Sequence, residues 1–179
     1  YESPCTWPDV MDERAKALRP SDDFVLRGDK RKCVHATATR YEGKIIIAYI
    51  LFYAKQEDIP IACGIARTGG HAPDIEYVYV ILDDSGEHLE WMFFSAHGWR
   101  ESSYVHASDV LVDSTTSRPV VYVSRFSHAN YWSGGSRWRL WGMARDVCNE
   151  GIILDSQPGL KIIGPDHPWL TYEGAMGPT

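Results

Sequence analysis

The chain has 179 residues, of which 44% are hydrophobic and 12% aromatic, and its formal net charge is −6. This length and composition suit one folded domain with a sizeable core and exclude a disordered chain. The acidic balance argues against sequence-independent nucleic-acid binding, which needs a basic face, and no run approaches the roughly 18 apolar residues of a membrane-spanning helix.

In chain order, one helix comes first and strands follow. Residues 8–19, PDVMDERAKALR, predict a helix with Asp9 as its cap and basic residues near its end. Runs rich in β-branched and aromatic residues predict strands at 44–53, 75–82, 87–96, 104–112 and 118–126. The turn sequence DDSG at 83–86 joins two of them into a hairpin. Residues 137–147, RWRLWGMARDV, fit either a short helix or an irregular strand.

These elements predict a mainly β fold, a two-sheet β-sandwich with minor flanking helices. We expect a single domain over residues 1–179, in which 1–40 form an N-terminal extension with the short helix and 41–179 form the core. The chain begins at Tyr1 rather than Met, as after removal of a leader, so we expect a secreted or surface protein.

The four cysteines, Cys5, Cys33, Cys63 and Cys148, include no C-x-x-C pair. A structural zinc site is therefore not expected. Two disulfides and four buried free thiols are both consistent with this spacing.

A polar cluster precedes one predicted strand. In GGHAPDIE, His71, Asp74 and Glu76 lie within six residues, and Asp74 and Glu76 point to the same side of a strand. Two adjacent carboxylates repel each other unless a proton, a basic side chain or a cation lies between them. Ca²⁺ or Mg²⁺, and less favourably Mn²⁺, suits such oxygen and imidazole ligands. The alternatives are a turn-capping role for His71 and ion pairs to one of three arginines, Arg67, Arg100 or Arg125.

Residues 48–76 resemble the core of the necrosis- and ethylene-inducing peptide-like proteins, secreted cytolysins whose hallmark is G-H-R-H-D-W-E after an aromatic strand and a K-D-x-P-like turn. The segment GHAPDIE keeps four of those positions, but Pro73 replaces the second His and Ile75 replaces the Trp. The chain is equally similar to the vacuolar protein sorting-associated protein sixty-two domain family. That resemblance includes SAHG at 95–98, PVVYVSRFSHANY at 119–131 and PWLTYEG at 168–174.

These resemblances imply a β-sandwich with a divalent cation near the rim of a sheet. They imply that the ion is held by Asp58, His71, Asp74 and Glu76, in a cavity that takes the sugar head group of a membrane sphingolipid. The expected partner is therefore a glycan or a membrane lipid head group.

Further residues with binding chemistry follow the cluster in the chain. His128, Asn130, Tyr131 and Trp132 form a polar and aromatic set suited to stacking on a sugar, or simply to loop packing. His97 either lines the same pocket or hydrogen-bonds a backbone carbonyl.

The sequence favours a non-enzymatic binding domain, because it contains no G-x-S-x-G motif and no spacing that singles out a catalytic triad. Two alternatives stay open. One is a structural or assembly subunit of a surface layer, with self-association, which the loss of the heptad's Trp and second His favours. The other is a metal-dependent hydrolase with His128 as the base.

Overall fold

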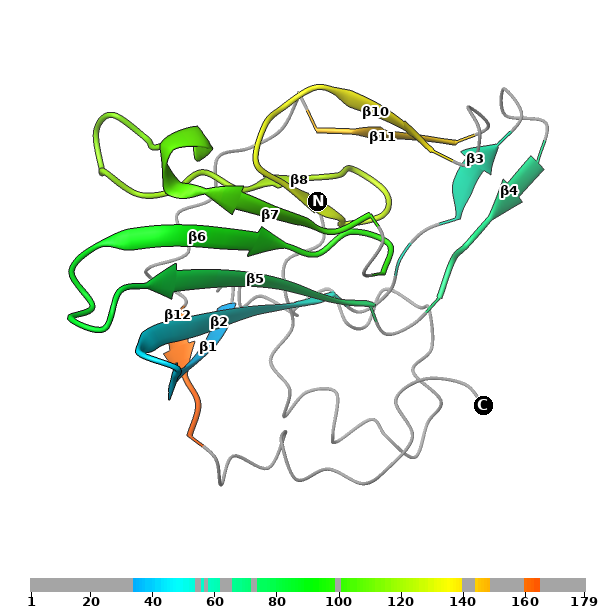
Figure 1. The fold of residues 1–179 in the computed structure, drawn as a ribbon. Helices are drawn as coiled ribbons and strands as arrows, with labels where there is room; N and C mark the ends of the chain where they lie inside the picture. The colour runs from blue at the N-terminus through cyan, green and yellow to red at the C-terminus, as the bar shows by residue number, and fades with distance from the viewer. Residues whose placement is uncertain are drawn as a thin grey trace.

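The computed structural model describes residues 34–53, 56, 58–61, 66–71, 74–98, 101–139, 144–148 and 160–164. Within them the chain forms twelve strands and one short 3-10 helix, η3 (Ala107–Asp109). The main sheet has six strands in the order β12-β1-β2-β5-β6-β7 (Figure 1). Their bounds are β1 Val34–Tyr41, β2 Lys44–Tyr53, β5 Asp74–Leu82, β6 Leu89–Phe94, β7 Ser103–His106 and β12 Leu160–Ile162.

Three two-stranded sheets accompany the main sheet. They pair β3 (Ile59–Ile61) with β4 (Ala66–Thr68), β8 (Tyr122–Val123) with β9 (Asn130–Tyr131), and β10 (Ser136–Arg139) with β11 (Ala144–Val147). Figure 1 shows the β3–β4 hairpin projecting beyond the end of the main sheet at which β5 begins.

Neighbouring strands of the main sheet are antiparallel, except that β12 runs parallel to β1. Strands β2 and β5 pair from Tyr53 opposite Asp74 to Ile45 opposite Leu82. Because side chains alternate along a strand, Asp74, Glu76 and Val78 all point to the buried face of β5. This register places two acidic residues on the inner face, at the end of the sheet where β5 starts.

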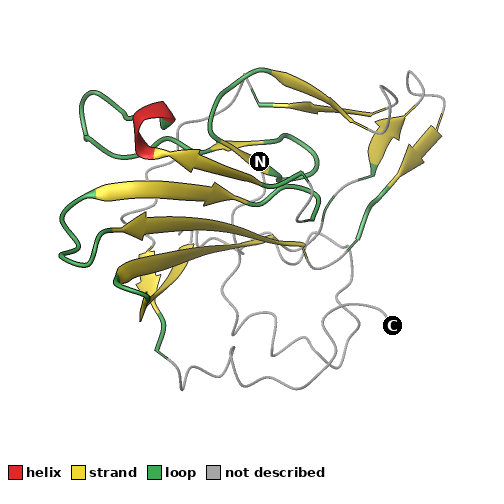
Figure 2. Cartoon of the chain, viewed as in Figure 1, coloured by secondary structure: helices red, strands yellow, loops and turns green. Residues whose placement is uncertain are grey.

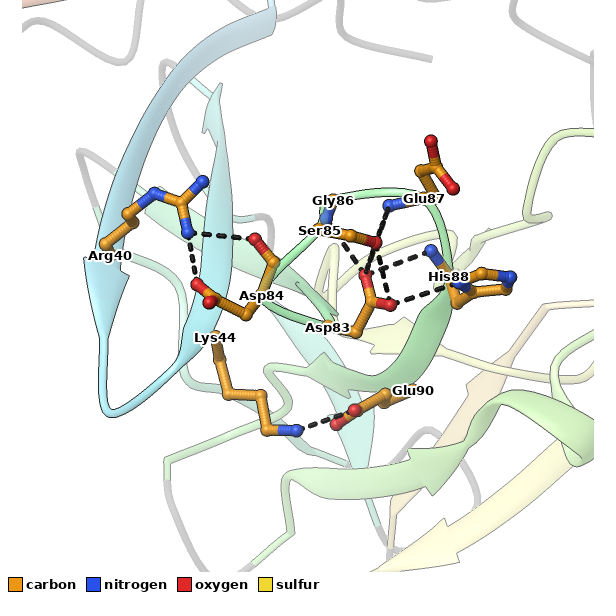
Figure 3. A network of polar contacts seen from close by, with 9 residues as sticks. All are labelled: Arg40, Lys44, Asp83, Asp84, Ser85, Gly86, Glu87, His88 and Glu90. Carbon is orange, nitrogen blue, oxygen red and sulfur yellow. Dashed lines mark hydrogen bonds and ion pairs between the residues drawn. The ribbon is translucent and has the colours of Figure 1, made fainter.

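The β5–β6 hairpin is held by one carboxylate at the opposite end of the same strand (Figure 3). Asp83 accepts hydrogen bonds from the backbone N–H groups of Gly86, Glu87 and His88 and from the Ser85 hydroxyl and the His88 ring. Gly86 has a positive φ of 80°, which glycine adopts without strain. The DDSG sequence therefore forms the predicted turn, because its side chains satisfy the turn's own backbone.

The larger of two apolar clusters among the described residues lies on the inner face of the main sheet. Its buried members are Val78, Met92, Phe94, Val105 and Val110. Partly buried Val121 and Trp132 pack against this cluster, so the segment that carries β8 and β9 covers the face as a second layer. A smaller cluster of Ala96, Ala129, Tyr131 and Cys148 continues the core beneath β10 and β11.

The predicted mainly β fold is confirmed, and the second layer is built from two-stranded sheets. Among the described residues η3 is the one helical segment (Figure 2), and the helix predicted at 8–19 lies outside them. Residues 137–147 form strands wherever they are described. Residues 34–40, placed by the sequence in the N-terminal extension, form most of β1. The single-domain prediction stays a prediction.

Two predicted strands are shorter than the sequence suggested. In 104–112 the strand ends at His106, because the His106 ring accepts the Ser108 N–H and starts η3. In 118–126 only Tyr122–Val123 are strand.

Of the four cysteines, Cys148 is described and has a buried free thiol, while the other three lie outside the described residues. In the part of the chain that the structure describes, no helix is long and apolar enough to cross a membrane.

Candidate functional site

The site begins at Asp74, the first residue of β5. Its side chain is buried, with the residue 4% exposed, and its Oδ2 accepts a hydrogen bond of 2.7 Å from His128 Nδ1. The His128 ring stacks on Tyr53, with 3.9 Å between ring centroids and 6° between planes. Because a carboxylate accepts this bond, Nδ1 of the neutral ring carries the hydrogen and Nε2 keeps its lone pair. His128 thus joins the predicted cluster from a distant part of the sequence.

His71 lies at the rim of the same site. Its side chain is 54% exposed, and its Nε2 lies 4.0 Å from Asp74 Oδ1. Backbone hydrogen bonds with Gln56 anchor the residue, so the ring reaches solvent from a fixed position. Asp58 is tied to the same loop, because its Oδ1 accepts the N–H of Gly70 at 2.9 Å. The structure therefore brings Asp58 next to the loop of His71, and its role as a metal ligand stays a prediction.

Glu76 occupies the inner face of β5 two residues after Asp74. Its Oε2 accepts a short hydrogen bond from the Ser95 hydroxyl, and Ser95 Oγ in turn accepts the N–H of Tyr77. Burial, which outweighs the lowering effect of the Ser95 bond, raises the pKa of Glu76 to about 8, with smaller contributions from the charges of Asp74 and Asp146. At neutral pH Glu76 is mostly protonated.

The His128 imidazole bonds Asp74, and the raised pKa of Glu76 favours its neutral form, so both effects weaken the repulsion between the two carboxylates. The described arginines that the sequence offered as partners have other contacts. Arg67 donates to the backbone oxygen of Asp58, and the guanidinium of Arg125 lies over the ring of Phe126. Arg100 lies outside the described residues.

Asn130 is the most deeply buried of the predicted ligand-binding residues, at 1% exposure. Its backbone N–H donates to Ser95 O at 2.8 Å, and its Nδ2 lies 3.4 Å from Ser95 Oγ. Its Oδ1 is buried and has no hydrogen-bond partner among the described residues. A buried acceptor without a donor is costly, so this atom marks a place for a cation, a water or a ligand donor.

Two aromatic residues predicted to stack on a sugar have their rings engaged within the protein. Tyr131 is buried, and its hydroxyl donates to Asp146 at 2.6 Å. Burial and this bond raise the pKa of Tyr131 well above its ordinary value. The guanidinium of Arg137 lies 4.2 Å from the Tyr131 ring centroid and 5.0 Å from that of Trp132. These contacts within the protein favour loop packing over sugar stacking for the two rings.

Sequence reasoning did not identify Asp146, which is 1% exposed and central to a second imidazole–carboxylate pair. His97 Nε2 contacts Asp146 Oδ2 at 2.6 Å. This side-chain contact is neither of the two roles that the sequence offered for His97. Asp146 could have been noticed from its place in a short strand, between Arg145 and Val147. An acidic side chain that points inward from a strand needs buried hydrogen-bond donors.

The four predicted metal ligands are only partly assembled. Asp58 precedes β3 and bonds Gly70, His71 lies 4.0 Å from Asp74 at the start of β5, and Glu76 follows Asp74 on the same strand face. Within the described ranges, no three His, Cys, Asp or Glu side chains form a group able to hold a metal ion by themselves. The divalent cation stays a prediction.

No family model matches the chain, and no curated protein matches it. Solved structures do. Necrosis and Ethylene inducing Protein 2 from the causal agent of cocoa's Witches Broom disease aligns with 16% identity and a TM-score of 0.44 over 72% of this chain and 50% of that one. NLPPya in complex with glucosamine aligns with 19% identity and a TM-score of 0.42 over 66% of this chain and 51% of that one.

A further structure, described as a toxin fold for microbial attack and plant defense, has 20% identity and a TM-score of 0.47 over 90% of this chain and 64% of that one. The chain thus spans about half the length of the first two structures. These values describe a likeness of fold and assign no function.

Proposed function

We propose that the chain is a non-enzymatic binding domain that recognises a glycan or a lipid head group at a cell or membrane surface with the help of a divalent cation. The observation that supports it best is the buried Oδ1 of Asn130, which has no hydrogen-bond partner in the described part of the chain. The Nδ2 of the same side chain lies near the Ser95 hydroxyl that bonds Glu76. Three oxygen-bearing side chains, Asp74, Glu76 and Asn130, face the interior at one end of the main sheet.

The chemistry of these donors fits a hard divalent ion. Carboxylate and amide oxygens are the ligands that Ca²⁺ and Mg²⁺ prefer, with waters completing the shell. Asp74 and Glu76 would hold the ion, Asn130 Oδ1 would add a neutral oxygen, and His71 and Asp58 would contribute from the rim. A bound cation supplies the positive charge that coordinates the hydroxyl oxygens of a sugar and replaces the proton on Glu76.

Besides the ion, the ligand would contact side chains of the protein itself. The Asp74 carboxylate holds the His128 ring so that Nε2 presents a lone pair, which accepts a hydrogen bond from a sugar hydroxyl. His71, more than half exposed, lies beside this pair and contributes a second polar contact at the entrance. These positions form a polar binding surface whose rings are fixed before the ligand arrives, which lowers the ordering cost of binding.

Calorimetry on chelator-treated protein tests the cation. Ca²⁺, Mg²⁺ and Mn²⁺ are titrated separately into the wild type and into Asp74→Asn, which keeps the side-chain shape. We expect saturable binding of at least one ion and a loss of about tenfold or more in Asp74→Asn. Asp83→Asn is the matched control, because Asp83 lies at the other end of β5, and its affinity should equal that of the wild type. No binding at millimolar ion, or unchanged affinity in Asp74→Asn, contradicts the proposal.

The ligand is tested with glucosamine and mannosamine and with vesicles that contain a glycosylated sphingolipid. Plain phosphatidylcholine vesicles are the control. Binding that requires both the sugar and the cation supports head-group recognition. Vesicle binding that is equal with and without the sugar contradicts it.

One observation supports a second candidate, a metal-dependent hydrolase. The Asp74–His128 bond orients the ring as it is oriented for a general base, with Nε2 available to take a proton. Turnover of glycoside or phosphoester substrates that is lost in His128→Gln would establish this function in place of simple binding.

A further inference from the structure

The buried carboxylate of Asp146 accepts hydrogen bonds from four side chains that come from separate parts of the fold. Oδ1 accepts from the hydroxyls of Ser127 at 2.7 Å and Ser124 at 3.1 Å. Oδ2 accepts from His97 Nε2 and from the Tyr131 hydroxyl, each at 2.6 Å. Burial alone raises the pKa of Asp146, but these bonds outweigh it and hold the pKa below its ordinary range, so the carboxylate stays charged.

One oxygen of this carboxylate fixes the ring of His97. The backbone of His97 has a positive φ of 46°, a region that residues other than glycine occupy only under constraint. The bond from Nε2 to Asp146 fixes the ring, and Nε2 carries the hydrogen because a carboxylate can only accept. In the neutral ring Nδ1 is left with the lone pair.

The other oxygen fixes His128 through a turn. The two serines at Oδ1 lie in the segment that leads to His128, and the N–H of His128 donates back to Ser124 O at 3.2 Å. The N–H of Ser124 donates to Ala129 O at 2.9 Å, which closes the turn. His128 also has a positive φ, 53°, and this conformation sends its ring to Asp74.

The two histidine loops are also joined directly. Asn130 donates its N–H to Ser95 O, and Ala96 and Ala129 pack together in the smaller core cluster. Two strained histidines therefore lie on adjoining loops, and each ring is held by a buried aspartate. Such strain persists only where the surroundings fix the conformation through several contacts.

We propose that Asp146 is the positioning residue of the binding site: its carboxylate orients the ring of His97 directly and the ring of His128 through the Ser124–His128 turn. This inference rests on the proposed function for its consequence in binding, but not for its effect on the two rings. Asp146 is 1% exposed, so it acts through the side chains that it bonds and not by contact with a ligand.

The arrangement has a spectroscopic signature that a merely structural aspartate would not produce. In the neutral state His97 carries its hydrogen on Nε2 and His128 carries it on Nδ1, so the two rings are opposite tautomers. Long-range ¹H–¹⁵N correlation at about pH 8.5 distinguishes the two forms, and His97→Gln and His128→Gln assign the signals. The spectrum is recorded without ligand and with chelator present.

Two variants test separately the direct effect of Asp146 on His97 and its indirect effect on His128. In Asp146→Asn the amide oxygen still accepts from His97 but without charge, so the His97 N–H proton moves upfield while the tautomer is kept. In the double variant Ser124→Ala with Ser127→Ala, His128 changes to a mixture of tautomers and His97 is unaltered. Circular dichroism verifies that both variants are folded. Unchanged signals of His97 in the first variant, or of His128 in the second, overturn the proposal.

Binding is measured on the same proteins with Ca²⁺ as the probe. We expect the affinity to fall by about tenfold in both variants, the lower end of what residues behind a ligand shell contribute. Asp83→Asn is the control, because it removes an equally well bonded carboxylate from the far end of β5. An equal loss in the control overturns the proposal. If the wild type binds no ion, the proposed function fails, and the ring signals still decide the role of Asp146.

Discussion

Replacing Glu76 by glutamine should stabilise the metal-free protein at alkaline pH and leave it unchanged at acidic pH. Burial raises the pKa of Glu76 from 4.5 to about 8, so the folded state favours the protonated, neutral form. Glutamine has nearly the same shape as that form and keeps an oxygen for the Ser95 hydroxyl. It cannot lose a proton as the pH rises.

The sign follows from proton linkage. Below about pH 4.5 both the folded and the unfolded chain carry the proton on Glu76, and wild type and variant are equally stable. Between 4.5 and about 8 the unfolded chain releases the proton first, so the wild type loses about 1.4 kcal/mol of unfolding free energy per pH unit from this group. The full difference is on the order of 5 kcal/mol, and it levels off above pH 8.

Urea unfolding at a series of pH values between 4 and 9, with chelator present, measures this difference. Subtracting the wild-type curve from that of Glu76→Gln removes the contribution of every other titrating group. A difference that is constant with pH, or a wild type that is the more stable protein at pH 8, would refute the reasoning. Added Ca²⁺ should then stabilise the wild type at pH 8 more than the variant, because only the wild type regains a carboxylate ligand.

Further predictions concern the loop, the core and the buried thiol. In Gly70→Ala the new Cβ would lie 2.7 Å from Asp58 Oδ1, so the Gly70–Asp58 hydrogen bond should break, at a cost of about 1 kcal/mol in urea unfolding; a change near zero would show that the loop adapts. Phe94→Ala removes a 0% exposed ring and should cost about 3–5 kcal/mol, and a loss below 1 kcal/mol would place Phe94 outside the core. Burial raises the pKa of the Cys148 thiol to about 11, so alkylation at pH 8 followed by peptide mass spectrometry should find it unmodified until denaturant is added. Labelling at the rate of an exposed thiol would contradict its buried position.

The local sequence pattern was sufficient to predict the strands that carry the site. The alternation in 75–82 and the DDSG turn predicted the β5–β6 hairpin, and the spacing of Asp74 and Glu76 placed both on one face. The need for a compensating group between them was also predicted. The sequence could not identify His128 as the partner of Asp74. His128 is distant in sequence and reaches Asp74 only because the second layer folds over the sheet.

Asp146 shows most clearly what the sequence could not provide. Its partners come from a loop after β6, a turn after β8, and β9, and no periodicity links those segments. Residues 137–147 were ambiguous because the two strands there are only four residues each and the segment between them contains Gly142. The positive φ values of His97 and His128 likewise depend on tertiary contacts, since only a few per cent of residues other than glycine adopt that region.

The parallel pairing of β12 with β1 has a consequence for how the chain reaches its fold. Four of the five pairings in the main sheet join strands that follow one another or enclose a single hairpin, and these can form early with small loop-closure entropy. The fifth joins Val34 to Leu160, so most of the chain lies between its partners. During synthesis β1 is therefore made long before its partner β12, and one edge of β1 stays unpaired until then. We expect the pairing of β12 with β1, which completes the sheet, to be the slow kinetic phase of refolding.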